Sequence, residues 1–308
     1  MTLVTPDAYR RQTMIDARWW QATVHSGKPV VACDLCPHAC IITEGQTGYC
    51  QVRSNAGGRL VSPYLGRFTS IAVDPIEKKP LYHWRSGTQI FSLGSLGCTM
   101  RCPFCQNCGI AQPSEQSLKR LPLKEISAQT LAAKCRELGI KAVAYTYNEP
   151  ALQAEYIIAA APVLREADIA TVLVSNGMYS ESLLRDLAPM VDAANIDIKS
   201  FNVDVYAKMG GSLDTVKRTI AKLLEAGVHV EATTLVVPEI SDSPEEFVQE
   251  TVWLAGLSPD IPLHISRYRP AHKYDAPSTD IELLQRFATM AQLRLKHVHI
   301  GNVSYLRV

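Results

Sequence analysis

The cysteines are the residues whose spacing indicates chemistry most clearly. Eight of the nine fall into two sets of four, namely Cys33, Cys36, Cys40 and Cys50, then Cys98, Cys102, Cys105 and Cys108. In a reducing compartment, clustered cysteines are more often metal ligands or redox groups than disulfide partners. The ninth, Cys135, lies alone in the helix-like run TLAAKCREL and is interpreted as a buried structural thiol.

The stretch GCTMRCPFCQNC (97–108) predicts an iron–sulfur site. Thiolates spaced as Cys98-x3-Cys102-x2-Cys105 on one tight loop can hold three irons of a [4Fe–4S] cluster and leave the fourth iron without a protein ligand. A different set of ligands is also compatible with the spacing. Cys102, Cys105 and Cys108 form a ferredoxin-like run, and with Cys98 they would give a fully ligated electron-transfer cluster or a zinc site. In the first interpretation Cys108 is a neighbour of the site and not a ligand.

The N-terminal set, Cys33-x2-Cys36-x3-Cys40-x9-Cys50, places four thiols on a short stretch with glycines in its turn. Tetrahedral zinc fits four thiolates, and the metal would stabilise a small loop that has little core of its own. His38 could replace one of the cysteines. An auxiliary iron–sulfur cluster is the main alternative to zinc.

Polar residues follow several predicted strands, where the functional face of a parallel α/β barrel is found. They are Asn148 and Glu149, Ser175 and Asn176, Asp197 and Lys199, with Val237 and His264 on or after later strands. Asp197 and Lys199 are two residues apart and therefore share one face of a strand. Each group also has a purely structural interpretation: a strand-to-helix turn at Asn148–Pro150, a salt bridge for the Asp–Lys pair, and a core histidine at 264.

These residues belong to an alternation of apolar strands and helical patterns that begins after the N-terminal part of the chain. The expected strands are 89–95, 141–147, 170–176, 195–201, 228–237, 262–268 and 297–303. The expected helices are 127–138, 150–166, 180–190, 212–226, 243–256 and 279–295. Continuous apolar strands separated by helices predict an α/β fold with a parallel sheet, here a partial (β/α)6 TIM-like barrel.

Residues 1–88 do not follow this alternation. They are expected to hold an amphipathic opening helix, the cysteine-rich knuckle and a β-meander through 58–75. We therefore expect two domains, 1–88 for this N-terminal part and 89–308 for the barrel.

The bulk composition limits the classes of function. The 308 residues carry a formal net charge of +1, which gives no electrostatic reason to expect a nucleic-acid or membrane-surface partner. No stretch approaches the ~18 apolar residues of a membrane span, and the first residues lack the apolar core of a signal peptide. The expected location is cytoplasmic.

Several stretches together resemble one branch of the radical SAM superfamily, the AmmeMemoRadiSam system enzymes, which are similar to pyruvate formate-lyase activating enzyme. They are CDLCPHACIITEGQTGYCQVR (33–53), VDPIEKKPLYHW (73–84), GCTMRCPFCQN (97–107), TYNEPA (146–151), NIDIKSF (195–201) and HISRYRPAHK (264–273). The resemblance implies a [4Fe–4S] cluster and S-adenosyl-L-methionine (SAM) as cosubstrate. It implies a SAM site formed by Phe104, Asn148, Glu149, Ser175, Asn176, Asp197, Lys199, Val237 and His264. The chain departs from the family at Cys108, where a tryptophan is usual, and at Val174, where activases carry an acid for a cation site.

The sequence thus predicts a radical SAM enzyme, in which the reduced cluster cleaves SAM to methionine and a 5′-deoxyadenosyl radical that abstracts hydrogen from a substrate. The substrate class stays open between a partner protein's glycine, as for a glycyl radical activase, and a small molecule or peptide. The resemblance implies an electron donor such as flavodoxin or ferredoxin, and protein partners encoded in the same cassette. The alternative is a non-catalytic iron–sulfur or zinc protein for electron transfer or assembly.

Overall fold

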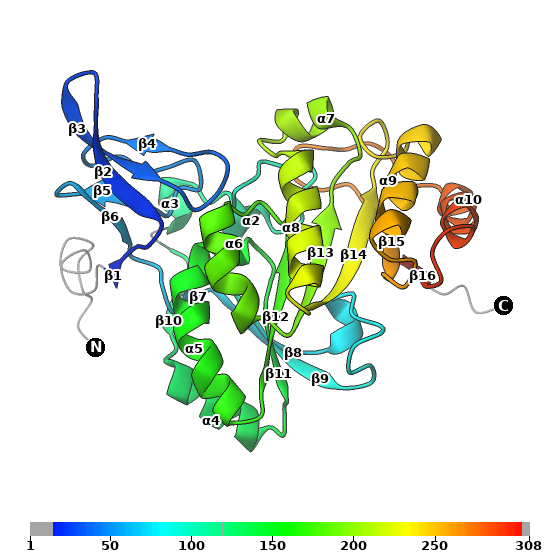
Figure 1. Cartoon of the computed structure of the whole chain (residues 1–308), viewed down its shortest axis with the longest axis horizontal. Helices are drawn as coiled ribbons and strands as arrows, with labels where there is room; N and C mark the ends of the chain where they lie inside the picture. The colour runs from blue at the N-terminus through cyan, green and yellow to red at the C-terminus, as the bar shows by residue number, and fades with distance from the viewer. Residues whose placement is uncertain (1–14, 119, 304–308) are drawn as a thin grey trace.

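A large sheet is the centre of the fold in the computed structural model, which describes residues 15–118 and 120–303 (Figure 1). Its eight strands lie in the order β16-β15-β14-β13-β12-β11-β9-β8. The bounds are β8 Ser70–Pro75, β9 Gln89–Gly94, β11 Ala142–Tyr145, β12 Ala170–Ser175, β13 Ala193–Ile198, β14 His229–Val236, β15 Leu263–Arg267 and β16 Val298–Gly301. All neighbours pair in parallel except β8 and β9, which are antiparallel. The predicted parallel α/β architecture is confirmed.

The expected helices are also confirmed, two of them with a short 3-10 turn at one end. They are α4 (Ala128–Glu137), η2 (Pro150–Gln153) with α5 (Ala154–Glu166), α6 (Glu181–Leu187) with η3 (Ala188–Met190), α8 (Leu213–Glu225), α9 (Pro244–Leu257) and α10 (Ile281–Gln292). Short polar side chains fix where they begin: Ser127, Ser180, Ser212, Ser243 and Asp280 each accept a hydrogen bond from a first-turn amide. The short helices α2 (Cys108–Ala111), α3 (Glu115–Leu118) and α7 (Val203–Lys208) were not expected.

The two faces of the sheet are covered differently. Residues such as Phe91 and Tyr145 pack in one large apolar cluster with the helices that connect the strands. The alternate residues, including Ile90 and Ala144, form a second cluster that is closed by Ile76 and Leu81, from η1 (Ile76–Lys78) and the loop after it. Because β9 and β11 to β16 run parallel, their carboxyl ends and the loops that follow them meet at one edge of the sheet.

The N-terminal part forms small sheets of its own beside this edge (Figure 1). One contains β1 (Ile15–Asp16), β6 (Arg59–Ser62) and β5 (Ser54–Ala56), and another contains β2 (Trp20–His25), β3 (Lys28–Cys33) and β4 (Ile41–Ile42). β7 (Arg67–Phe68) pairs with β10 (Lys124–Glu125). The predicted β-meander over 58–75 is wrong, because β6, β7 and β8 pair with strands of three different sheets. Gly66, with a φ of +70°, turns the chain between β6 and β7 away from a simple hairpin.

Two further expectations concern this part of the chain. The opening helix is expected at the start of the chain, and residues 1–14 lie outside the described residues. The division at residue 88 stays a prediction, although the large sheet itself extends back across that position to β8. Within residues 15–118 and 120–303, no helix is both long and apolar enough to cross a membrane.

Candidate active site

The loop between β9 and α2, here called the cluster loop (95–107), carries Cys98, Cys102 and Cys105. Cys102 is buried, and Cys98 and Cys105 are partly exposed; all nine cysteines are free. Burial is the largest cause that raises the pKa of each of the three thiols, to about 11 for Cys102, and the neighbouring thiols raise them further. The three thiols therefore lie close enough to influence one another, and a thiolate form there needs positive charge or amide donors nearby.

Such groups surround the three sulfurs. The amide of Met100 donates to Cys98 Sγ at 3.4 Å. The amide of Asn107 and the ammonium of Lys199 lower the pKa of Cys105, and Lys199 lowers that of Cys102 as well. Among the residues that the structure describes, no group of three or more His, Cys, Asp or Glu side chains is arranged to hold a single metal ion. This finding covers Cys33, Cys36, Cys40 and Cys50 as well as the cluster loop. Cysteines that share a [4Fe–4S] cluster bind different irons and need not surround one ion.

Asn148, after β11, holds the start of the cluster loop. Its Oδ1 accepts from the amide of Ser95 at 2.9 Å, and its Nδ2 donates to the carbonyl of Gly97 at 2.9 Å. From the other end of the loop, Asn107 Nδ2 donates to the carbonyl of Tyr147 at 2.9 Å. The predicted Asn-Glu-Pro motif therefore contacts the cysteine loop directly.

Glu149 joins the ends of two strands. It is 1% exposed, and its carboxylate accepts from the amides of Ala151 and Asn176 and from the hydroxyl of Ser175. Burial raises its pKa from 4.5 to about 7, although these hydrogen bonds act to lower it. Both oxygens are occupied by the chain's own donors, so Glu149 positions the ends of β11 and β12.

Asn176, directly after β12, contacts the first cysteine of the motif. Its Nδ2 lies 3.5 Å from Cys98 Sγ and 3.0 Å from Thr99 Oγ1. Its Oδ1 accepts from the amide of Met178 at 3.0 Å, which fixes the orientation of the side-chain amide. The end of β12 is thereby joined to the cluster loop.

Asp197 and Lys199 form an ion pair at the end of β13. Lys199 Nζ lies 2.7 Å from Asp197 Oδ2, and the side chains of Lys199 and Asp197 are 18% and 28% exposed. Burial acts to lower the pKa of Lys199, but Asp197 and Cys102 raise it well above its usual range. Lys199 is therefore a cation, and the ion pair is partly open to solvent and next to the cysteine thiols.

The remaining residues predicted for the SAM site are Phe104, Val237 and His264. Phe104 and Val237 are buried in the large core cluster. His264 is also buried, but its ring nitrogen Nε2 lies 2.6 Å from Glu231 Oε2. None of these contacts joins His264 to the other predicted SAM-site residues.

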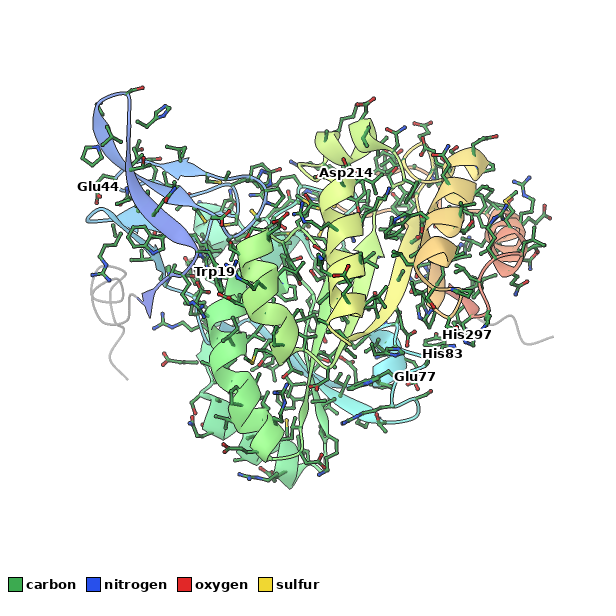
Figure 2. The ribbon with its side chains drawn as sticks, in the orientation of Figure 1. Trp19, Glu44, Glu77, His83, Asp214 and His297 are labelled. Atoms are coloured by element: carbon green, nitrogen blue, oxygen red, sulfur yellow. The ribbon has the colours of Figure 1, made fainter. Side chains whose placement is uncertain are left out.

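His264 instead belongs to a group of histidines around Glu231. His229 and the amides of Tyr82 and His83 also hydrogen-bond to that carboxylate, and His83 Nε2 lies 2.8 Å from His299 Nε2. Figure 2 shows His83 and His297 together at the end of the sheet where strands begin, and Asp214 of α8 at the opposite end. The sequence analysis missed this group, although Glu231, an acidic residue inside an apolar strand, was a signal for it.

Cys108 begins α2 and is partly exposed. Its thiol is close enough to Cys105 to raise the pKa of that residue. The sequence analysis also missed Ser95, Gly97 and Thr99, the polar or small residues beside the motif that receive the contacts from Asn148 and Asn176.

The N-terminal cysteines, on a segment here called the knuckle (33–53), also lie near one another, since their charges influence each other's pKa. Burial raises the pKa of Cys33, Cys36 and Cys50, and backbone amides two residues further along, at 35, 38 and 52, donate to these three sulfurs and lower it. The buried guanidinium of Arg53 lowers the pKa of Cys33 and Cys50 as well. These donors are of the kind that stabilise thiolates.

Known proteins share this architecture. Residues 92–251 match the family model of the radical SAM superfamily. An uncharacterized protein of Methanocaldococcus jannaschii is 36% identical over 278 residues, which cover 89% of this chain and 81% of that protein. The 7-carboxy-7-deazaguanine synthase of Thermococcus kodakarensis is 26% identical over 175 residues, or 52% of this chain and 66% of that enzyme.

Solved structures agree at the level of the fold. Streptococcus suis SuiB bound to S-adenosylmethionine superposes with a TM-score of 0.52 at 14% identity, over 69% of this chain and 49% of SuiB. A radical SAM methyltransferase from Sphaerobacter thermophilus gives 0.50 at 16% identity, over 69% of this chain and 66% of that chain. The chain thus spans about half the length of SuiB. Since the family model covers about half of the sequence and the Methanocaldococcus relative most of it, the chain belongs to the radical SAM superfamily, a family of enzymes whose fold implies a [4Fe–4S] cluster and SAM.

Proposed function

We propose that Cys98, Cys102 and Cys105 hold the cluster of this enzyme and that SAM binds beside them at the carboxyl ends of β11, β12 and β13. Radical SAM chemistry is the reductive cleavage of SAM, by one electron from the cluster, to methionine and a 5′-deoxyadenosyl radical that takes a hydrogen atom from a substrate. The observation that carries the proposal is that Asn148 and Asn176, from two successive strand ends, hydrogen-bond to the loop with the three cysteines.

The charged pair at β13 supports the placement of SAM. SAM carries an amino group, a carboxylate and a sulfonium, so its site needs both signs of charge close together. Asp197 and Lys199 supply both, and each side chain is partly exposed next to the cysteine thiols. Phe104 and Val237 are buried in the apolar core, and Glu149 positions the strand ends. His264 lies outside the proposed site, because its contacts are to Glu231.

The knuckle is proposed to hold Zn²⁺, with an auxiliary iron–sulfur cluster as the alternative. Four cysteines at short spacing supply the ligands that zinc prefers. Burial raises the pKa of Cys33, Cys36 and Cys50, but backbone amides donate to all three, and the Arg53 guanidinium lies near Cys33 and Cys50. Analysis of zinc, iron and labile sulfide in anaerobically purified protein separates the two metals.

The reaction proposed for this site is hydrogen abstraction, in the manner of an activating enzyme, with flavodoxin or ferredoxin as the electron donor. The similarity to pyruvate formate-lyase activating enzyme favours a glycine of a partner protein as the hydrogen donor. SuiB, which resembles this chain in fold, has been solved with a precursor peptide, and the Thermococcus relative is a synthase of a small molecule. A peptide or a small molecule is therefore the second class of substrate.

The ligand set can be tested by spectroscopy of the reduced protein. Wild type is expected to bind four irons per cluster at the cluster loop and to change its electron paramagnetic resonance (EPR) spectrum when SAM is added. Cys102→Ala should lose this signal, whereas Cys135→Ala, which removes a buried thiol of α4, should keep it. A SAM-dependent signal in Cys102→Ala would contradict the proposed ligand set.

A further inference from the structure

The knuckle contacts the cluster loop through a histidine between its second and third cysteines. The amide of His38 donates to the thiol of Cys36. Its ring Nε2 lies 2.8 Å from the carbonyl oxygen of Thr99. Because a carbonyl only accepts, Nε2 must carry the proton. His38 thus connects the thiol of Cys36 to Thr99, the residue that follows Cys98.

A second connection runs through Tyr49. Its amide donates to Cys40 Sγ at 3.4 Å, and its carbonyl accepts a hydrogen bond from the guanidinium of Arg101. The guanidinium carbon of Arg101 also lies 4.5 Å from the centre of the Tyr49 ring, a cation–π contact. Since Arg101 precedes Cys102, Tyr49 connects the thiol of Cys40 to a second cysteine of the motif.

The two connections form one unit. The rings of His38 and Tyr49 are stacked, with their centroids 3.9 Å apart and an interplanar angle of 21°. The backbones of the two segments also approach closely: a Cβ at Gly97 would lie 2.6 Å from the carbonyl oxygen of Cys50. Neither segment can move far without displacing the other.

The knuckle ends at a buried ion pair. Arg53 is fully buried and pairs with Glu155, which is 8% exposed. Within the described part of the chain, the buried Nε of Arg53 has no hydrogen-bond partner.

We propose that the knuckle is a metal-dependent support for the cluster loop, and that His38 and Tyr49 are positioning residues that transmit its order to Cys98 and Cys102. The inference rests on the proposed function, because it assumes a cluster at the cluster loop and a metal in the knuckle. With the knuckle metal bound, Cys36 and Cys40 are fixed, and so are the two residues hydrogen-bonded to them. With the metal removed, His38 and Tyr49 lose that anchor, and the thiols of the cluster loop are no longer held in position for iron.

The test compares His38→Ala with two matched variants. His25→Ala removes an exposed histidine of the neighbouring hairpin, and His38→Gln keeps a side-chain N–H donor in place of the ring N–H that contacts Thr99. For each purified protein, zinc and iron per chain and the EPR spectrum of the reduced cluster are measured. The loss of one hydrogen bond, worth about 1 kcal/mol, predicts about fivefold weaker retention of iron under a chelator in His38→Ala, with an altered spectrum. His25→Ala should match wild type, and His38→Gln should recover most of the iron.

The outcomes separate this inference from the proposed function. Wild type without a cluster would overturn the proposed function itself. Wild type with a cluster but without metal in the knuckle would overturn the metal-dependent support and leave the proposed cluster site standing. Wild type with both, but with His38→Ala equal to wild type in iron retention and spectrum, would overturn only the support by the knuckle. Removal of the knuckle metal by Cys36→Ser should lower the iron at the cluster loop as well. Unchanged iron in that variant would also contradict the inference.

Discussion

The side-chain amide of Asn176 lies 3.5 Å from the sulfur of Cys98, so the end of β12 donates a hydrogen bond to a predicted cluster ligand. The same side chain is oriented by the backbone amide of Met178 on its other side. Hydrogen bonds to ligand sulfurs stabilise the reduced, more negative state of a cluster and raise its potential. The structure thus connects a strand-end residue to the redox property on which radical SAM chemistry depends.

Asn176→Leu leaves the three cysteines unchanged and removes the side-chain amide that donates to Cys98. We expect the cluster to assemble and its midpoint potential to fall by about 60 mV, which corresponds to roughly 1.4 kcal/mol for one electron. Redox titration followed by EPR measures the potential. Asn202→Ala, which removes the cap of α7, is the control and should leave the potential unchanged. An unchanged potential in Asn176→Leu would show that the contact has no electronic role.

The raised pKa of Glu149 predicts that the free energy of unfolding depends on pH. Its pKa is raised from 4.5 to about 7, so the native state binds the proton more tightly than the unfolded chain does. The resulting contribution, roughly 3 kcal/mol for a shift of this size, is fully present below pH 4.5 and is lost as pH rises to about 7. Urea unfolding of the metal-free, reduced protein at about pH 5 and about pH 8 measures it.

Glu149→Gln should remove this part of the pH dependence. Glu250 provides the matched control, because it is also fully buried and burial raises its pKa to about 8. Glu250→Gln should remove a similar part of the dependence but leave the cluster loop intact, since its hydrogen bond is to Thr234. The interpretation of Glu149 is wrong if Glu149→Gln shows the same difference between the two pH values as wild type.

Gly97 has a φ of +81°, and a Cβ there would lie 2.6 Å from the carbonyl oxygen of Cys50. Gly97→Ala therefore adds a backbone clash to the strain of a left-handed conformation and should cost about 3 kcal/mol of unfolding free energy. Gly87 has nearly the same φ, +79°, but a Cβ there would meet nothing within 4 Å, so Gly87→Ala should cost only about 1 kcal/mol. Chemical denaturation compares the two, and equal costs would contradict the close packing of knuckle and cluster loop.

Substitution of Cys108 tests which cysteines bind the cluster. Since α2 begins at Cys108, outside the turn that carries the other three thiols, Cys108→Ala should retain the iron of the cluster loop. Cys105→Ala should lose it. Iron and sulfide per chain, counted after anaerobic reconstitution, decide between the two ligand sets. A cluster lost in Cys108→Ala would favour the fully ligated alternative.

The sequence allowed the parallel sheet, its helices and the cysteine loop to be predicted, because these depend on local patterns. Strands such as β12 are continuous apolar runs, and caps such as Ser212 mark helix starts within a few residues. The place of Asn176 at a strand end was predicted, but its contact with Cys98 was not. What failed was long-range pairing: β8 has the alternating pattern of any half-buried strand, and nothing local shows that it joins β9 and not β7.

His264 shows the same limit for a functional site. A resemblance of motifs placed it near SAM, but its partner Glu231 lies on the neighbouring strand, and the pairing depends on the register of β14 and β15. Likewise, the spacing of the knuckle cysteines predicted a metal site but not the contacts of the knuckle with Thr99 and Arg101. Both contacts join residues that are far apart in the sequence.

The most direct test of the central claim is the formation of 5′-deoxyadenosine. Reconstituted wild type is incubated anaerobically with SAM and dithionite, and the nucleoside is measured by chromatography and mass spectrometry beside Cys102→Ala. We expect 5′-deoxyadenosine and methionine in equal amounts from wild type and neither from the variant. An intact, reduced cluster in wild type that yields no 5′-deoxyadenosine would contradict the account.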